Sequence, residues 1–454
     1  MECFAVYSND IMGRIDPLYL KNILVLEKIK NKYSLVKLGS LLKKNVQYGA
    51  NESAINGNPI KDVRYIRITD IDEFGNLKNN DWKTSQIVKK KYELNEGDIL
   101  FARSGATAGK CFYYKNEYGK SIFAGYLIRF VFDEKKVNPK YIFYYSQLNH
   151  FKLWIRTIQR PSGQPNINSE EFKSFKIPLP PLSIQNQIVS IMDNAYKIKK
   201  QKENEAQQLL DSFEELLRDE KVLDLKKITR KKMFSINLND LDGAFNPERY
   251  ANQIQFDRVV DWIKINNIGQ IYRDTFTPEK TNPENIYSLM RIDDLANNPI
   301  SAVTRNVKGK DVNGTILKVQ TNDVLIARLG PTIENRKFVL APKSNIELIS
   351  SNEFICLRCN EINNPYFALH LLKTDFYKNL MIQKTRGATP SRMRLSHEDF
   401  SELPFPKIDI EIQSKIAEEV KRRMLKAERL QNEAKQLLQE AKEKVEKIIL
   451  ENRN

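Results

Sequence analysis

The chain has 454 residues, a hydrophobic fraction of 41% and a net charge of +16, so we expect more than one domain and an anionic partner. Four cysteines are too few for a disulfide framework in a chain of this length. The sequence shows neither an apolar run of the ~18 residues that a membrane span needs nor a secretory signal, so we expect a cytoplasmic protein.

An internal repeat with a period of about 225–230 residues runs through the sequence. Four pairs of segments correspond in the same order: Arg67–Ile71 and Arg291–Leu295, Asp98–Thr107 and Asp323–Thr332, Asn138-Pro139 and Asn364-Pro365, and Gln185 and Gln413. Because order and spacing are kept throughout, the sequence predicts a duplicated module rather than a solenoid.

Each copy is predicted to contain a helical lead-in, several strands, a helix after an Asn-Pro pair, and a polar loop. The patterns predict helices over 17–30, 141–155, 247–264 and 366–381, and strands over 65–68, 98–103, 123–132, 323–328 and 354–358. Short helices should begin at Asn168 and Ser396, where an acidic residue follows three places on, close to a capping box.

Two long helices follow proline-rich segments. The first is expected to begin after Ile177–Leu182 with Ser183 as its N-cap, and the second to begin after Leu403–Pro406. Apolar residues alternate at steps of four and three along both helices, which is the heptad pattern of paired helices. The predicted order is module one (1–181), a long central helix (182–220), a basic linker (221–232), module two (233–407) and a C-terminal long helix (408–454), in an α+β fold.

Motifs for catalysis or metal binding are weak. The segment Ser104–Lys110 is similar to a phosphate-binding loop, but three residues rather than four separate its glycines, and Cys111 stands where Ser or Thr should bind magnesium. We therefore predict a tight turn there. Cys356 and Cys359 are expected in the core, because zinc needs about four ligands. We expect no catalytic residue, metal site or cofactor in this chain.

Basic and polar residues of the types that contact phosphates and base edges gather in loops. Residues shared by the copies should hold the scaffold or a phosphate, whereas residues that differ could read two different sequences. The candidate DNA-binding residues are Arg64, Arg67, Arg103, Ser104, Arg160, Gln164, Asn166, Arg291, Arg328, Lys384, Arg386, Arg392 and Arg394.

The ordered set of repeat motifs, proline exits and Gln-containing helix starts resembles the specificity (S) subunit of type I restriction–modification systems. The resemblance implies two target recognition domains of mixed α/β structure, held apart by two long antiparallel helices. It further implies a non-catalytic subunit that reads a bipartite site in double-stranded DNA and docks two methyltransferase subunits and the restriction (motor-endonuclease) subunits. S-adenosylmethionine, ATP and Mg would then belong to those partners. Copy two departs from copy one because its sequence lacks the Gly109-Lys110 pair.

Two alternatives remain open at this point: a stand-alone DNA-modifying enzyme with an unrecognised site, and a coiled-coil protein scaffold. If the central helix acts as a ruler over Ser183–Leu217, its 35 residues span about 52 Å, which equals roughly 15 base pairs of B-DNA.

Overall fold

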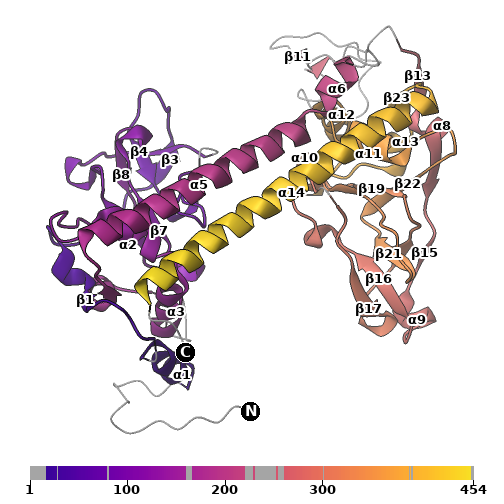
Figure 1. The fold of residues 1–454 in the computed structure, drawn as a ribbon. Helices are drawn as coiled ribbons and strands as arrows, with labels where there is room; N and C mark the ends of the chain where they lie inside the picture. The colour runs from indigo at the N-terminus through magenta and orange to yellow at the C-terminus, as the bar shows by residue number, and fades with distance from the viewer. Residues whose placement is uncertain are drawn as a thin grey trace. The chain divides into compact units, whose positions relative to one another are not determined.

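The computed structural model describes residues 17–27, 29–78, 81–159, 166–219, 229–230, 252–253, 260–299, 301–387, 389 and 392–450. The chain forms two compact units: unit 1 is Met1–Gln201 with Glu433–Asn454, and unit 2 is Lys202–Asn432. Both units combine helices with sheets, as the α+β prediction requires (Figure 1). The units divide the chain within the long helices, and the predicted domain boundaries stay a prediction.

Unit 1 contains a four-stranded antiparallel sheet in the order β2-β9-β6-β7 and three two-stranded sheets. Its strands are β1 (Leu35–Lys37), β2 (Gln47–Tyr48), β3 (Ala54–Asn56), β4 (Arg64–Ile66), β5 (Lys83–Ser85), β6 (Ile99–Ala102), β7 (Cys111–Tyr113), β8 (Ser121–Phe123), β9 (Leu127–Phe130) and β10 (Lys176–Pro178). Its helices before the long pair are α1 (Pro17–Glu27), α2 (Pro139–Tyr145), α3 (Asn149–Ile158) and α4 (Ser169–Ser174).

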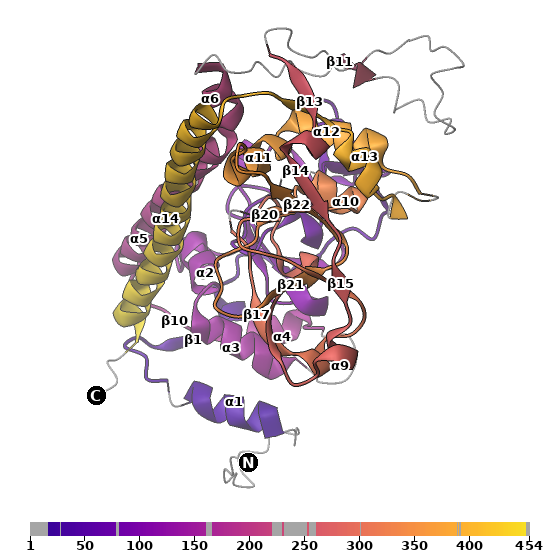
Figure 2. The same cartoon turned by 90° about the vertical axis from the view of Figure 1, so that its right-hand side faces the viewer.

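Unit 2 contains a matching four-stranded sheet in the order β14-β22-β19-β20 and a five-stranded sheet in the order β15-β18-β21-β16-β17. Its strands are β11 (Thr229–Arg230), β12 (Asn252–Gln253), β13 (Trp262–Lys264), β14 (Gly269–Tyr272), β15 (Thr275–Phe276), β16 (Ile286–Met290), β17 (Arg305–Lys308), β18 (Ile316–Lys318), β19 (Val324–Ala327), β20 (Phe338–Leu340), β21 (Leu348–Ser351), β22 (Phe354–Cys359) and β23 (Pro404–Pro406). Its helices before α14 are α6 (Phe213–Asp219), α8 (Ile265–Ile268), α9 (Pro278–Thr281), α10 (Gly330–Glu334), α11 (Pro365–Leu372), α12 (Asp375–Lys384) and α13 (His397–Ser401). Figure 2 shows α11 and α12 toward one end of this unit and α9 toward the other.

Strands β6 and β19 are the centres of the two units. Every residue of both strands is fully buried, because each strand has neighbours on both sides and a hydrophobic core on each face. Alternation along the strand divides its side chains between two cores. Ile99 and Phe101 enter one core of unit 1, while Leu100 and Ala102 enter the other. The continuous apolar runs after Asp98 and Asp323 follow from this burial on both faces.

The long helices are α5 (Leu182–Asp211) and α14 (Ile410–Ile449). In unit 1, Ile188 and Met192 of α5 share a core with Ala441 and Val445 of α14. In unit 2, Ala206 of α5 packs with Ala427 and Leu430 of α14. The helices therefore run antiparallel within each unit (Figure 1), and their apolar side chains pack together.

Several boundaries correct the sequence predictions. Helix α5 begins at Leu182 rather than after Ser183, because the Pro181 carbonyl accepts the N–H groups of Ile184 and Gln185. It ends at Asp211, and the separate helix α6 follows Ser212. The Ser212 hydroxyl bonds back to the Leu209 carbonyl at 2.7 Å, a contact that favours a bend in a helix.

The predicted helices after the Asn-Pro pairs each divide in two: α2 and α3 in unit 1, and α11 and α12 in unit 2. The lead-in predicted over 17–30 forms α1, but the one over 247–264 is wrong at 262–264, which is strand β13. Its remaining residues are the short strand β12, residues 260–261 outside any element, and residues outside the described part. Among the described residues, no helix is long and apolar enough to cross a membrane.

Candidate nucleic-acid interface

The end of β6 brings three predicted residues together in unit 1. Ser104 forms an antiparallel bridge with Asn166, and Arg103 Nε donates to Asn166 Oδ1 at 3.1 Å. The Arg103 guanidinium also lies over the Tyr48 ring, 4.9 Å from its centroid. The Arg103 backbone is fixed by the Tyr126 carbonyl at 3.0 Å and the Ile167 N–H at 2.8 Å. We call Arg103, Ser104, Asn166, Tyr48 and Tyr126 the unit 1 tip.

The end of β19 has the same backbone arrangement in unit 2. Leu329 bridges Arg394, the Glu353 carbonyl accepts from Arg328 N at 3.1 Å, and Leu395 N donates to the Arg328 carbonyl at 2.9 Å. The Arg394 guanidinium donates to both carboxylate oxygens of Glu353, at 3.0 and 3.1 Å. That carboxylate raises the pKa of Arg394. Arg328, Leu329, Glu353 and Arg394 form the unit 2 tip.

The two tips therefore share a backbone but present different side chains. Asn166 corresponds to Arg394, and Tyr126, which is 65% exposed, corresponds to Glu353. An amide and a guanidinium prefer different base edges in the major groove. The duplicated scaffold thus carries two chemically different polar surfaces.

The remaining predicted residues of unit 2 differ in their exposure and in their contacts. Arg386 exchanges two backbone hydrogen bonds of 2.9 Å with Arg394, and its guanidinium pairs with Asp399 at 3.3 Å. Arg392 and Arg291 are exposed, whereas Lys384, at the end of α12, is partly buried. Arg328 is also partly buried, and its Nε has no hydrogen-bond partner among the described residues.

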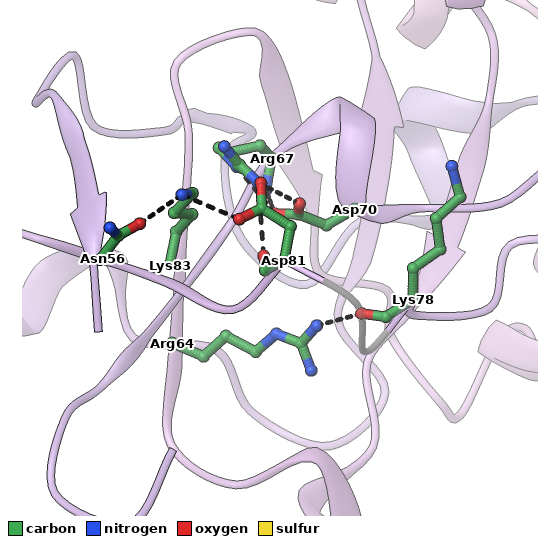
Figure 3. Close-up of polar contacts among 7 residues, drawn as sticks. All are labelled: Asn56, Arg64, Arg67, Asp70, Lys78, Asp81 and Lys83. Carbon is green, nitrogen blue, oxygen red and sulfur yellow. Dashed lines mark hydrogen bonds and ion pairs between the residues drawn. The ribbon is translucent and has the colours of Figure 1, made fainter. Parts of the chain in front are cut away.

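Arg64 and Arg67 are engaged within unit 1 (Figure 3). Arg64 is 5% exposed and donates to the Lys78 carbonyl, and burial lowers its pKa. Arg67 pairs with Asp70 at 2.6 Å and with Asp81 at 2.8 Å, and the hydrogen bond to Asp70 raises its pKa. These contacts favour a structural role, and a DNA contact by either residue stays a prediction. Arg160 and Gln164 lie outside the described residues.

Four tip residues were missed from the sequence: Tyr48, Tyr126, Leu329 and Glu353. Tyr126 and Glu353 occupy matching positions in the turn before β9 and β22, so alignment of the copies through those strands could have found them. Tyr48 carries no such signal, because its contact with Arg103 arises from the β2–β9 pairing.

The glycine-containing segment after Ser104 forms a tight turn, as predicted. Lys110 Nζ donates to the Ile71 carbonyl at 2.9 Å, so this ammonium is committed to the scaffold. The sequence of copy two lacks the Gly109-Lys110 pair, but the structure of unit 2 has a counterpart of Lys110. Lys337 Nζ donates to the Ile292 carbonyl at 3.1 Å. Arg336, with φ of 47°, takes the place of Gly109, with φ of 85°.

The cysteines and histidines of the described residues are packed rather than clustered. Cys356 is fully buried and Cys359 partly buried, and burial raises the pKa of Cys359 to about 12. Burial lowers the pKa of His150 to about 4 and that of His370 well below its usual value. Within the described part of the chain, no group of three or more His, Cys, Asp or Glu side chains could hold a metal ion.

The fold and the tips define a class of protein: a tandem repeat of one α+β module, with a long helix after each copy and a different polar tip on each. Residues 30–208 match the family model of the type I restriction modification DNA specificity domain. Residues 30–208, the part of the chain that contains copy one and most of α5, are therefore similar to that family.

The chain is 26% identical over 179 residues to the type I restriction enzyme StySPI specificity subunit of Salmonella potsdam, a match that covers 37% of this chain and 38% of that protein. It is 30% identical over 112 residues to the MjaVIII specificity subunit of Methanocaldococcus jannaschii, covering 25% of each. A crystal structure of the type I S subunit of M. genitalium covers 94% of this chain and 98% of that chain at 12% identity and a TM-score of 0.46. The chain thus matches well under half of the length of the two curated relatives.

Proposed function

We propose that this chain is the non-catalytic DNA sequence-recognition subunit of a type I restriction–modification complex. In this proposal each unit reads one half of a bipartite target in double-stranded DNA. The unit 1 tip reads one half-site and the unit 2 tip reads the other. The excess of basic over acidic residues, 73 against 57, favours a polyanionic ligand.

The observation that carries the proposal is the identical backbone bridge at the two tips, Ser104 to Asn166 and Leu329 to Arg394. A duplication that kept only one binding function would have no need of different side chains at the matching positions. Here Asn166 is held by Arg103, whereas Arg394 is held by Glu353. The same loop geometry therefore presents an amide in one unit and a guanidinium in the other.

The proposal assigns catalysis to partners. The subunit docks methyltransferase and restriction subunits in the cytoplasm, and S-adenosylmethionine, ATP and Mg bind to those subunits rather than to this chain. The specificity-subunit names of the relatives support this assignment.

Methyl transfer by purified proteins tests the proposal. The chain alone should transfer no methyl group from S-adenosylmethionine to DNA, and addition of its methyltransferase partner should produce methylation at one bipartite sequence. The methyltransferase without this chain is the control and should give no sequence-specific signal. Robust methylation by the pure chain would contradict the proposal and favour a stand-alone enzyme.

A further inference from the structure

A cavity of about 460 Å³ in unit 1 lies where α3, the turn after Ser104 and the last part of α14 meet. Four basic side chains line it: Lys110, Lys152, Arg156 and Lys442. Glu73 is the one acidic residue among the described residues that line the cavity. None of these side chains belongs to the unit 1 tip.

A glycine allows these basic side chains to lie close together. Gly109 has φ of 85°, and a Cβ at this position would lie 2.6 Å from Ile155 Cγ1. Helix α3 can therefore pack directly on the turn only because residue 109 lacks a side chain. Ile155 is buried in this contact, while Lys152 and Arg156 on the same helix remain exposed at the cavity.

The cations of this cavity have little compensation. Among the described residues, Lys152, Arg156 and Lys442 form no ion pair with a carboxylate. Burial, followed by the charge of Lys152, lowers the pKa of Lys442 to about 8, and the carboxylates of Glu446 and Glu73 offset this only in part. Repulsion among the cations would be relieved by an anion in the cavity.

The corresponding cavity of unit 2, about 300 Å³, differs in its charge. The two cavities match because Gln147 Nε2 donates to the Phe74 carbonyl at 2.8 Å, as Lys373 Nζ does to the Pro299 carbonyl at 2.5 Å. In unit 2, Arg336 pairs with Asp375 at 2.5 Å. Asp211 and Glu214 also line that cavity, so its positive charges are balanced within the protein. The excess of positive charge is therefore specific to unit 1.

We propose that the unit 1 cavity binds a phosphate group of the DNA backbone beside the half-site that the unit 1 tip reads. Thr107 and Lys110, which line the cavity, belong to the segment that directly follows Arg103 and Ser104 of the tip. A duplex held at the tip would thus have its backbone near the cavity that Lys152, Arg156 and Lys442 line. Such a contact positions the duplex and carries no sequence information. The inference rests on the proposed function, and the same chemistry could also accept a free phosphate.

The test compares the full chain with the double variant Lys152→Ala/Arg156→Ala and with Lys442→Gln. Lys444→Ala is the matched control, because Lys444 is exposed on α14 and does not line the cavity. Affinity is measured by fluorescence anisotropy at several salt concentrations for a target duplex and for a scrambled duplex. Thermal unfolding confirms that each variant is folded.

We expect the cavity variants to weaken binding of both duplexes by the same factor, and to make the slope of log K against log salt shallower by about 1 for each phosphate lost. The control variant should keep the wild-type slope. An unchanged slope in the cavity variants, with target preference intact in the wild type, would overturn this inference and leave the proposed function standing. Absence of target preference in the wild type would instead overturn the proposed function.

Two further arms identify the source of the phosphate. Inorganic pyrophosphate is titrated into the DNA-free chain, and its thermal shift is compared with that of the double variant. No shift is expected for a site that needs the duplex, whereas a shift that the double variant lacks would reassign the cavity to a free phosphate ligand. If the double variant keeps its salt slope but no longer associates with the methyltransferase, the cavity binds an acidic protein segment and the proposal fails.

Discussion

The side chain of Gln185 closes onto the backbone of Asn138: its Oε1 accepts from the Asn138 N–H at 2.8 Å, and its Nε2 donates to the Pro180 carbonyl at 2.8 Å. Gln413 makes the same contact with Asn364 N, at 2.9 Å, in unit 2. Both glutamines are almost completely buried. The repeated Asn-Pro and Gln motifs are thus two ends of one contact, which fixes a long helix to the helix that follows the Asn-Pro pair.

This contact predicts that truncation of the Gln185 side chain destabilises the protein. Gln185→Ala leaves the partly buried Asn138 N–H and the buried Pro180 carbonyl without this partner, and should lower the free energy of unfolding by about 1–3 kcal/mol. Gln187→Ala is the control, because Gln187 is exposed two residues away on the same helix. Denaturant unfolding followed by tryptophan fluorescence measures both. Equal stability of the two variants would contradict the structural role.

Substitutions in one tip should change the reading of one half-site and leave the other half-site unchanged. Arg394→Ala and Arg392→Ala should alter reading of one half-site, at a cost of roughly 1–3 kcal/mol at one position if the side chain contacts a base. If the side chain contacts a phosphate, binding should weaken evenly over all sequences. Asn166→Ala should act on the other half-site. Methylome sequencing of each variant decides, and a unit 2 substitution that changes both half-sites would show that the assignment of tips to half-sites is wrong.

The ion pair between Glu353 and Arg394 predicts that Glu353 also affects DNA binding at the unit 2 half-site. Because Glu353 accepts hydrogen bonds from Nε and Nη2 of Arg394, Glu353→Gln should weaken this contact, release the guanidinium for DNA contacts and change affinity at the unit 2 half-site. Tyr126→Phe, at the matching position of unit 1, is the paired substitution, and it should leave the unit 2 half-site unchanged. Binding to duplexes altered in one half-site at a time measures both effects.

The length of α5 predicts the spacer between the half-sites. Its 30 residues span about 45 Å, or roughly 13 base pairs, which is shorter than the sequence estimate because the helix ends before Ser212. Four residues inserted after Lys202 add about 6 Å and keep the seam roughly in phase, since four residues are close to one turn. The half-sites should be unchanged and the spacer longer by one or two base pairs. A fully active variant with the old spacer would refute the ruler hypothesis.

The partly buried His150 and the buried His370 predict acid sensitivity. The folded-state pKa of His150 is lowered to about 4, below its unfolded value of 6.5, and that of His370 is also lowered. Between these values the unfolded state binds more protons, so stability should fall as pH decreases from about 6.5. His150→Asn should reduce the slope of unfolding free energy against pH between pH 7 and 5, where the slope is at most about 1.4 kcal/mol per pH unit for each histidine. An unchanged slope would show that His150 is not a source of the acid sensitivity.

The sequence alone determined the duplication, the α+β class, the two long helices and a minority of the strands, among them β6, β19 and β22, because each depends on local periodicity, prolines or the order of repeated motifs. The strand predicted over 123–132 is wrong at 124–126, where a turn separates β8 from β9. The sequence placed Gln185 and Asn138 in the repeat but could not show that they touch, since that contact joins residues 47 positions apart. Only the tertiary structure decided which arginine side chains are exposed and unpaired enough to contact DNA. Arg64 is buried and Arg67 is held by two aspartates, whereas Arg291 and Arg392 are exposed. The availability of a charged side chain depends on neighbours that chain folding brings close, and no local pattern of residues encodes them.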